Sequence, residues 1–428
     1  MKKIIGIVLG ITVIVGGFLG SQQLGFGYKK VTEEALEVPT WRVEQNITND
    51  AYLTYVDEYD INKDTTSLGG AQSKFYSKYI EYTAPNGKPI RIVAMNTVTD
   101  DQMLYAYNLL SFYLKNIESL NKGEVANQMA NNKAVLILPN GADRDGKTPA
   151  AAMALGQNLN QAEIANIGSA WYVNNNFEHR DAAFEEIFHM VHDYGVGTST
   201  NVQAAPEISK WIEKGLTTAL PSDKSKWGKE GLWGLSSKSW LEELSKEGSL
   251  EQEYIASVID SYYGLWEPWS DGSGGMWGTY VAKTREEIGL KDPNGLLAIE
   301  SILPSSIDQM MRVDPSFTGD FLMRKDDSKP YTYKTQYLKC VTLTGSNDSN
   351  IIGNEHDNVL MGNSGTNIVD GGKGHDVYQL RGNLSEYTFV KSGSSMTITD
   401  TVFGRDGKSI LENIDVVRAT DEDYLISK

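Results

Sequence analysis

The chain of 428 residues contains a single cysteine, Cys340, and only five histidines. One cysteine excludes an internal disulfide and any metal site built from several thiolates. Basic residues are also few, because 39 lysines and arginines stand against 56 aspartates and glutamates, for a formal net charge of −17. This balance, with no basic stripe, argues against nucleic-acid binding and is typical of a soluble exterior protein or of one that binds cations.

The N-terminus carries a long apolar run, from Ile4 to about Leu19, directly after Lys2 and Lys3. This order is typical of a secretory signal, so the sequence predicts export and a secreted or cell-surface protein. The run is long for the apolar core of a signal and short for a membrane span, and no A-x-A site follows it. Residues 1–22 are therefore interpreted as a signal peptide or as a signal anchor that attaches the protein to a membrane.

Residues 23–80 form a polar, tyrosine-rich lead-in region whose function the sequence does not indicate. Residues 81–325 then show the periodicities of an α+β domain. Strands are predicted over "KPIRIVAMNTV", "KAVLILPNG" and "NIGSAWYVNNN", and a helix over "TDDQMLYAYNLLSFYLKNI", which begins at a Thr-Asp cap. Further helices are predicted at about 205–218, 236–246, 250–264 and 295–311.

The stretch "AAFEEIFHMVHDYG", residues 182–195, is a candidate metal site. Each residue of an α-helix advances by about 100°, so Glu185, His189 and His192 lie on one face. Two imidazoles and a carboxylate are a donor set that zinc accepts. The alternative is an ordinary amphipathic helix with solvated polar side chains opposite its apolar face. Three of the five histidines lie between residues 179 and 192, and this concentration favours the metal site.

In its context the segment "EEIFHMVHDYG" resembles the active-site helix of gluzincin metallopeptidases of the lethal-factor type. That helix reads H-E-x-x-H, and a later helix begins an E-[FY]-x-A segment, which "EYIA" at residues 253–256 matches. The resemblance covers roughly residues 80–315 and implies a zincin-like domain with a small sheet, an active-site helix and a helical C-terminal lobe. It implies that His189 and Glu253 are metal ligands and that Glu186 is the general base that activates water.

Glu185 stands where the family has its first histidine ligand, and this departure leaves two alternatives open. A glutamate adds negative charge and makes a metal-bound water less acidic than a neutral imidazole does. His192 can restore the lost nitrogen ligand beside His189 and Glu253, with Glu185 as a fourth ligand or as a group behind the ligands. If Glu185 fills the fourth position the site is closed, and a closed site is structural.

The region 341–428 has a nine-residue period in which Gly353, Gly362 and Gly371 share one phase. Such a period indicates an all-β parallel β-roll, and the alternating tail predicts strands that cap it. The segment "GGKGHDVYQ" matches every fixed position of the motif G-G-x-G-x-D-x-U-x. These residues resemble the repeats-in-toxin (RTX) family, which implies calcium-dependent folding outside the cell. The candidate calcium-binding residues are Asp357, Asn358, Asn367, Gly371, Gly372, Gly374 and Asp376.

The sequence thus favours an exported metal-dependent endopeptidase, with zinc as the expected metal, followed by a calcium-binding module. The expected partners are a peptide or protein substrate and calcium ions, and not a nucleic acid. The alternative is a non-catalytic calcium-binding surface or adhesion protein whose metal site is degenerate or structural.

Overall fold

The computed structural model describes residues 60–118, 120–174 and 181–426. Their fold is mixed α/β, with helices and with sheets that contain parallel strands, and it is compatible with the predicted α+β class. The predicted signal, residues 1–22, and the lead-in region as far as residue 59 lie outside the described residues.

The expectation of membrane attachment is corrected. Among the described residues, no helix combines the length and the apolar character needed to cross a membrane. The apolar run from Ile4 to Leu19, on which the expectation rested, lies outside the described residues.

A four-stranded sheet forms the first part of the fold, in the order β1 (Lys78–Thr83), β2 (Pro89–Ala94), β3 (Val135–Leu138) and β4 (Gln157–Asn158). β1 pairs antiparallel with β2, whereas β2, β3 and β4 run parallel. Every residue of β3 is buried, as expected for a strand covered on both faces. Two of the predicted strands and the helix between them are present.

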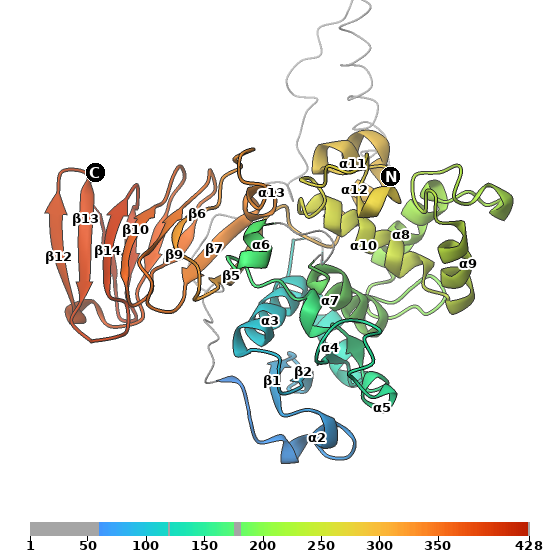
Figure 1. The fold of residues 1–428 in the computed structure, drawn as a ribbon, viewed down its shortest axis with the longest axis horizontal. Coiled ribbons are helices and arrows are strands. Elements are labelled where there is room, and N and C mark those ends of the chain that lie inside the picture. The colour runs from blue at the N-terminus through green and yellow to red at the C-terminus, as the bar shows by residue number, and fades with distance from the viewer. Residues whose placement is uncertain (1–59, 119, 175–180, 427–428) are drawn as a thin grey trace, which may run out of the picture. The chain divides into compact units, whose positions relative to one another are not determined.

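Some of the helices contact this sheet, and most of the chain between residues 183 and 300 is helical (Figure 1). The described α-helices are, in chain order, α2 (Gln72–Phe75), α3 (Asp100–Leu114), α4 (Lys122–Asn131), α5 (Ala150–Met153), α6 (Ala170–Asn174), α7 (Ala183–Val191), α8 (Pro206–Ala219), α9 (Lys238–Glu247), α10 (Leu250–Tyr262), α11 (Arg285–Lys291), α12 (Pro293–Glu300) and α13 (Thr332–Thr335). The helix over "TDDQ" begins as predicted, because Thr99 and Gln102 form a capping box.

Two predicted elements differ in the structure. The strand predicted over "NIGSAWYVNNN" contains the short helix α6, because the hydroxyl of Ser169 accepts a hydrogen bond from the Tyr172 backbone at 3.3 Å and starts a helical turn. The helix predicted at 295–311 ends at Glu300, and strand β5 (Ile307–Val313) follows the break at Pro304.

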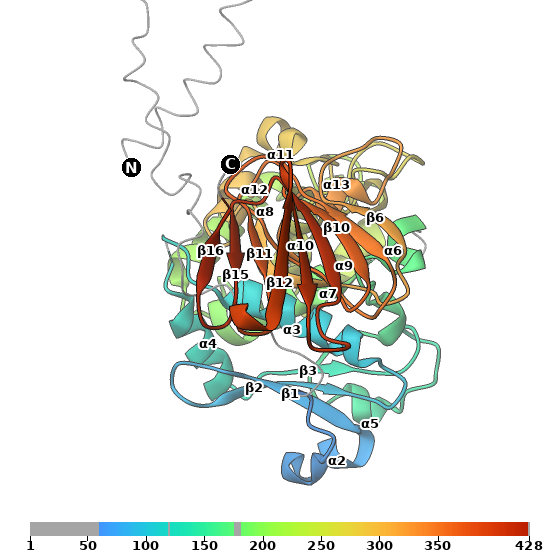
Figure 2. The same ribbon diagram turned by 90° about the vertical axis from the view of Figure 1, so that its left-hand side faces the viewer.

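The C-terminal strands form two six-stranded sheets, here called the paired sheets (Figure 2). One has the order β12-β13-β14-β10-β8-β6 and the other β16-β15-β11-β9-β7-β5. Their strands are β5, β6 (Gly319–Leu322), β7 (Leu338–Leu343), β8 (Ser349–Ile352), β9 (Val359–Met361), β10 (Thr366–Asp370), β11 (Val377–Gln379), β12 (Tyr387–Ser392), β13 (Ser395–Asp400), β14 (Lys408–Glu412), β15 (Val416–Arg418) and β16 (Asp423–Leu425).

Successive strands from β5 to β11 alternate between the two sheets and pair in parallel with the next strand but one. Val359 therefore lies beside Val377, eighteen residues later. Strands β12–β14 and β15–β16 end the two sheets with antiparallel pairs. β5 and β6 already belong to these sheets, although they precede the predicted repeat region.

Helix α3 contacts both α7 and β5. The Tyr113 hydroxyl donates to the backbone oxygen of Phe184 at 2.8 Å, and the Asn108 amide donates to the backbone oxygen of Met310 at 2.6 Å. Both bonds are buried, so α3 fixes the position of α7 relative to the first strand of the paired sheets.

Candidate metal centre

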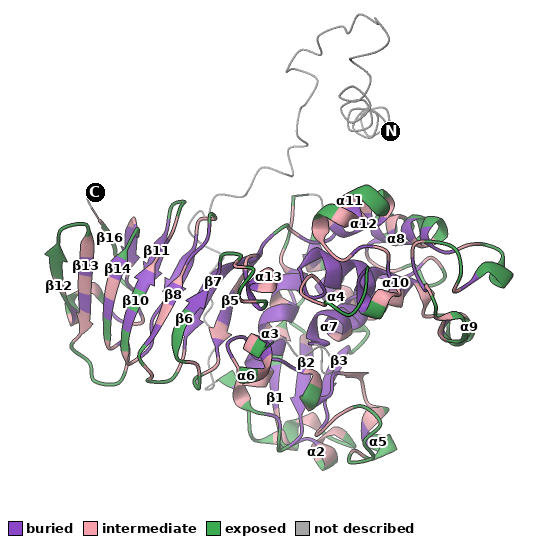
Figure 3. Cartoon of the chain, turned by 45° about the horizontal axis from the view of Figure 1, so that its top comes forward, coloured by how far each residue is buried: buried purple, intermediate pink, exposed green. Residues whose placement is uncertain are grey.

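Helix α7 carries the candidate metal ligands and is buried along most of its length (Figure 3). Its apolar residues Phe184, Ile187, Phe188 and Val191 are all in the core. Asp181 lies just before the helix, and its carboxylate accepts a hydrogen bond from the Ala183 backbone at 3.1 Å. Because α7 packs against α3, α10 and β4, polar groups on nearly every side of it are removed from water.

Three predicted ligands come together. One side-chain donor atom from each of Glu185, His189 and Glu253 lies within 4.8 Å of the other two. Glu185 and His189 are 4% and 7% exposed, and Glu253 reaches them from the first turn of α10. The Nε2 atom of His189 lies 3.9 Å from Oε1 of Glu253.

These residues fit a metal ion. Nε2 of His189 is buried and makes no hydrogen bond to any described residue, which is an unfavourable state for an imidazole nitrogen. Donor atoms around tetrahedral zinc stand about 3.3 Å apart, so a small rotation of the side chains closes the group around an ion. The described group is therefore able to bind a metal ion.

Glu186 lies beside the other ring nitrogen of His189. Its Oε2 atom is 3.6 Å from Nδ1, whereas Oε1 of Glu253 lies 3.9 Å from Nε2. The Oε2 atom of Glu186 also accepts a hydrogen bond from the side-chain amide of Gln157 at 2.7 Å. Gln157 belongs to β4, so the sheet holds the carboxylate that lies beside Nδ1 of His189.

Burial and neighbouring charges shift the pKa values of the two histidines in opposite directions. Burial alone lowers the pKa of His189, but the carboxylates of Glu186 and Glu253 outweigh this effect and raise the pKa to about 9. Burial and the charge of His189 lower the pKa of His192 to about 3. His192 is consequently a neutral side chain. Burial also raises the pKa of Asp193, which accepts a hydrogen bond from Gln252 at 2.8 Å.

His192 is not one of the three grouped ligands. It is fully buried, and its ring centre lies 5.9 Å from that of Phe188. Neither ring nitrogen makes a hydrogen bond within the described part of the chain. His192 also begins a turn of π-helix, His192–Val196, in which the Gly197 backbone donates to the His192 carbonyl at 2.8 Å. The structure thus uses the carboxylate of Glu185, and not His192, to complete the group.

The asparagines at the predicted calcium positions have their amides engaged inside the protein. Asn367 is fully buried, donates to the backbone oxygen of Ser349 at 2.8 Å and to the side chain of Asn363 at 2.9 Å, and accepts from the Asn363 backbone at 2.9 Å. Asn358 makes the same pair of bonds with Asn354, at 3.0 and 3.1 Å. Both amides are therefore used as hydrogen-bonding groups inside the protein.

The aspartates differ from the asparagines. Asp357 accepts a hydrogen bond from the His375 backbone at 2.7 Å, and Asp376 accepts one from the Asn358 backbone at 2.8 Å. The second oxygen of Asp376 makes no hydrogen bond to a described residue, although Asp376 is only 1% exposed. Burial, together with the nearby Asp415, raises the pKa of Asp376 to about 8. Of the predicted calcium positions with side-chain oxygens, Asp376 fits a cation best.

The glycines of the motif let successive turns touch. A Cβ atom on Gly372, whose φ is +91°, would lie 2.4 Å from the backbone oxygen of Asn354, and one on Gly374 would lie 2.8 Å from that of His356. A Cβ atom on Gly371 would lie 2.4 Å from the backbone oxygen of Asn413. These three predicted calcium residues thus serve close backbone packing.

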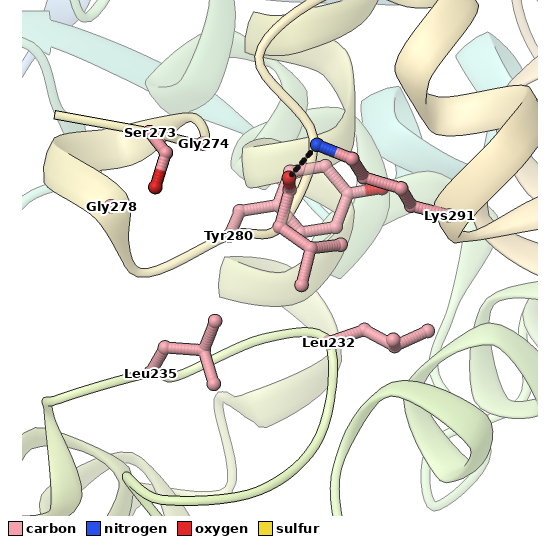
Figure 4. A pocket seen from close by; sticks show the side chains of 8 residues that line it. Leu232, Leu235, Ser273, Gly274, Gly278, Tyr280 and Lys291 are labelled. Atoms are coloured by element: carbon pink, nitrogen blue, oxygen red, sulfur yellow. Dashed lines mark hydrogen bonds between the residues drawn. The ribbon is translucent and has the colours of Figure 1, made fainter.

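A pocket of about 430 Å³ lies in the helical region (Figure 4). Leu232, Leu235 and Tyr280 contribute to its wall, and the Lys291 amine donates to the backbone oxygen of Val281 at 3.0 Å. None of the grouped ligands lines this pocket, so it is separate from the metal centre.

Gln157 was not predicted from the sequence, because it lies 29 residues before Glu186 and on a two-residue strand that has no periodic pattern. No family model, curated protein or solved structure matches the chain. The resemblances to gluzincins and to RTX proteins therefore stay predictions from the sequence.

Proposed function

We propose that the protein is an exported hydrolase of peptide bonds that binds zinc through Glu185, His189 and Glu253. The observation that carries the proposal is the buried Nε2 atom of His189, which makes no hydrogen bond to a described residue and lies 3.9 Å from Oε1 of Glu253, within a group that also contains Glu185. Leaving a buried polar atom without a partner costs about 1–3 kcal/mol, and a bound cation would remove this cost. It would also neutralise two adjacent carboxylates that otherwise repel each other.

Zinc with three protein ligands supplies an open position, at which it acidifies water and polarises a carbonyl group. Two carboxylate ligands offset the full charge of a divalent ion, so water at this centre is less acidic than at a centre with neutral histidine ligands. We therefore propose an enzyme whose hydrolytic activity rises toward alkaline pH. Burial of α7 keeps bulk water away from Glu185 and His189.

The alternative proposal is a non-catalytic protein with a structural ion at the same centre. It is favoured by the position of Glu186, whose carboxylate lies 3.6 Å from Nδ1 of His189 and accepts a hydrogen bond from Gln157. Both proposals include export, which is supported by Lys2, Lys3 and the apolar run that follows them.

We also propose that the paired sheets are an RTX-type parallel β-roll. The support is the alternation of parallel strands between two sheets with a spacing of eighteen residues, twice the nine-residue period. Calcium enters this proposal at Asp376, where a buried carboxylate oxygen has no hydrogen bond to a described residue.

The test is the metal content of the purified full chain, measured by mass spectrometry, together with cleavage of an unfolded protein substrate. We expect one zinc per chain in the wild type and loss of zinc in His189→Ala and Glu253→Gln. Glu243→Gln, which replaces an exposed carboxylate on α9, is the matched control and should keep its zinc.

Stoichiometric zinc without cleavage of any substrate would support the structural ion. A wild-type protein that binds no divalent transition metal would refute both proposals for the centre.

A further inference from the structure

We propose that Glu186 and Gln157 are positioning residues that orient the His189 ring, so that its Nε2 atom presents a lone pair to the metal. This inference rests on the proposed metal centre and assigns Glu186 a role other than that of general base. The inference follows from which ring nitrogen of His189 the carboxylates of Glu186 and Glu253 each approach.

The two ring nitrogens of His189 have different neighbours. Nε2 lies 3.9 Å from Oε1 of Glu253, within the group that also contains Glu185. Nδ1 lies 3.6 Å from Oε2 of Glu186. Glu186 and Glu253 thus approach different nitrogens of the same ring.

A carboxylate beside Nδ1 favours the tautomer that carries its hydrogen there, which leaves Nε2 as the atom that binds metal. Such carboxylate–histidine–metal arrangements fix the orientation of the ring and make the imidazole a stronger ligand. The distance of 3.6 Å exceeds that of a normal hydrogen bond, and it shortens if the ring moves slightly toward Glu186 when metal binds.

Gln157 holds the carboxylate of Glu186 in this place. Its amide donates to Oε2 of Glu186 at 2.7 Å, the same oxygen that faces the imidazole. Gln157 is paired with Leu136 of β3, so its backbone is fixed by a buried strand. A flexible glutamate on the partly exposed side of α7 is thereby tied to the sheet.

A general base must reach the water that it deprotonates, directly or through one further water. Glu253 approaches Nε2, the ring nitrogen without a hydrogen bond, which would hold the ion. Glu186 approaches Nδ1 instead, and Gln157 engages its carboxylate. The geometry therefore assigns Glu186 to the orientation of a ligand.

The experiment compares zinc affinities of the wild type, Glu186→Ala, Glu186→Gln and Gln157→Ala, measured by competition with a chromophoric chelator. Loss of a group that supports a metal ligand weakens binding by about 10–100-fold, and we expect this for Glu186→Ala. Glu186→Gln retains an acceptor oxygen and should lose less. Gln157→Ala should weaken binding in the same direction, because the carboxylate loses its tie to β4. Glu243→Gln is the control and should match the wild type.

Nitrogen-15 NMR of histidine-labelled, zinc-loaded protein gives a second measurement that a general loss of stability would not reproduce. We expect a protonated Nδ1 and a metal-bound Nε2 for His189 in the wild type, and a mixture of ring orientations in Glu186→Ala. Glu186→Gln is close in shape to the wild type and serves as the folded variant if Glu186→Ala does not fold.

The outcomes separate this inference from the proposed function. If the Glu186 variants bind zinc as tightly as the wild type but lose cleavage, the positioning role is refuted and Glu186 is the base of a functioning peptidase. If the wild type binds no zinc, the centre itself is refuted, and the positioning role falls with it.

Discussion

The calcium motif carries an aspartate at the position of Asn367, so Asn367→Asp separates two explanations. Loss of buried hydrogen bonds predicts less stable sheets, whereas calcium binding predicts protection by calcium. Asn367 is fully buried, and its amide donates one hydrogen bond to Ser349 and one to Asn363. An ionised aspartate has the same shape but donates neither bond. We therefore expect Asn367→Asp to destabilise the paired sheets in the presence and in the absence of calcium.

The size of the loss follows from the two acceptors that the change leaves behind. The backbone oxygen of Ser349 and the side-chain oxygen of Asn363 would each face a carboxylate oxygen in place of a donor. Each unsatisfied buried acceptor costs about 1–3 kcal/mol, so the total loss is about 2–6 kcal/mol. Burial raises the pKa of the new carboxyl above that of an unfolded aspartate, so the loss is smallest below about pH 4 and grows as the pH rises.

Hydrogen exchange, followed by mass spectrometry of peptides from residues 345–379, measures this loss where it occurs. The wild type and Asn367→Asp are compared in excess calcium and in a calcium chelator. Ser394→Asp is the control, because it adds the same charge at an exposed position in the turn between β12 and β13 and removes no buried donor.

We expect faster exchange in Asn367→Asp under both conditions, and no change in Ser394→Asp. Calcium-dependent protection of Asn367→Asp beyond that of the wild type would refute the reasoning. It would show that these turns form cation sites when an aspartate is present.

The remaining predictions concern single buried positions. Lys122 is fully buried, its amine has no hydrogen bond to a described residue, and burial lowers its pKa to about 7. The unfolded chain therefore binds more protons than the folded one between about pH 7 and 10.5. The free energy of unfolding should rise with pH over this window, by on the order of 5 kcal/mol in total. Lys122→Met should be more stable than the wild type near pH 7 and should lose this dependence in urea unfolding followed across pH, and an unchanged dependence would contradict the assignment. Gly353→Ala should destabilise the paired sheets, seen as several-fold faster hydrogen exchange, because its Cβ would lie 2.0 Å from the backbone oxygen of Gly371. Gly289→Ala on α11 meets only ordinary contacts and should be neutral or slightly stabilising. Equal effects of the two changes would refute the close contact between turns.

Much of the fold was predictable from local patterns. Strands β2 and β3 and helices α3, α8 and α10 coincide with predicted segments, because each combines a clear period with a cap or a break. The predictions of secondary structure failed where a cap or a strand partner overrode the local composition. The run "SAWYV" has the composition of a strand, but the capping hydroxyl of Ser169 starts a helix there. The apolar residues of β5 read as a continuation of α12 until β7 is available as its partner.

The candidate centre was predictable in part, and for a geometric reason. The helical period places Glu185 and His189 on one face of α7, so two candidate ligands follow from sequence spacing alone. Glu253 needed the resemblance to a family, since 64 residues separate it from His189 and only packing of α10 on α7 joins them. The Oε2 atom of Glu186, which lies beside Nδ1 of His189, accepts a hydrogen bond from Gln157 in β4, and no spacing rule contains that contact.

The eighteen-residue spacing of the paired sheets makes their length independent of the rest of the molecule. Each strand from β7 to β11 pairs only with the strands before and after it in the same sheet, while β5 meets α3 at one end and antiparallel strands close the other. An insertion of eighteen residues between β8 and β10 would add one strand to each sheet and leave both ends unchanged. An insertion of nine residues would move every later strand into the opposite sheet. Natural or engineered variation in the number of repeats should therefore occur in pairs.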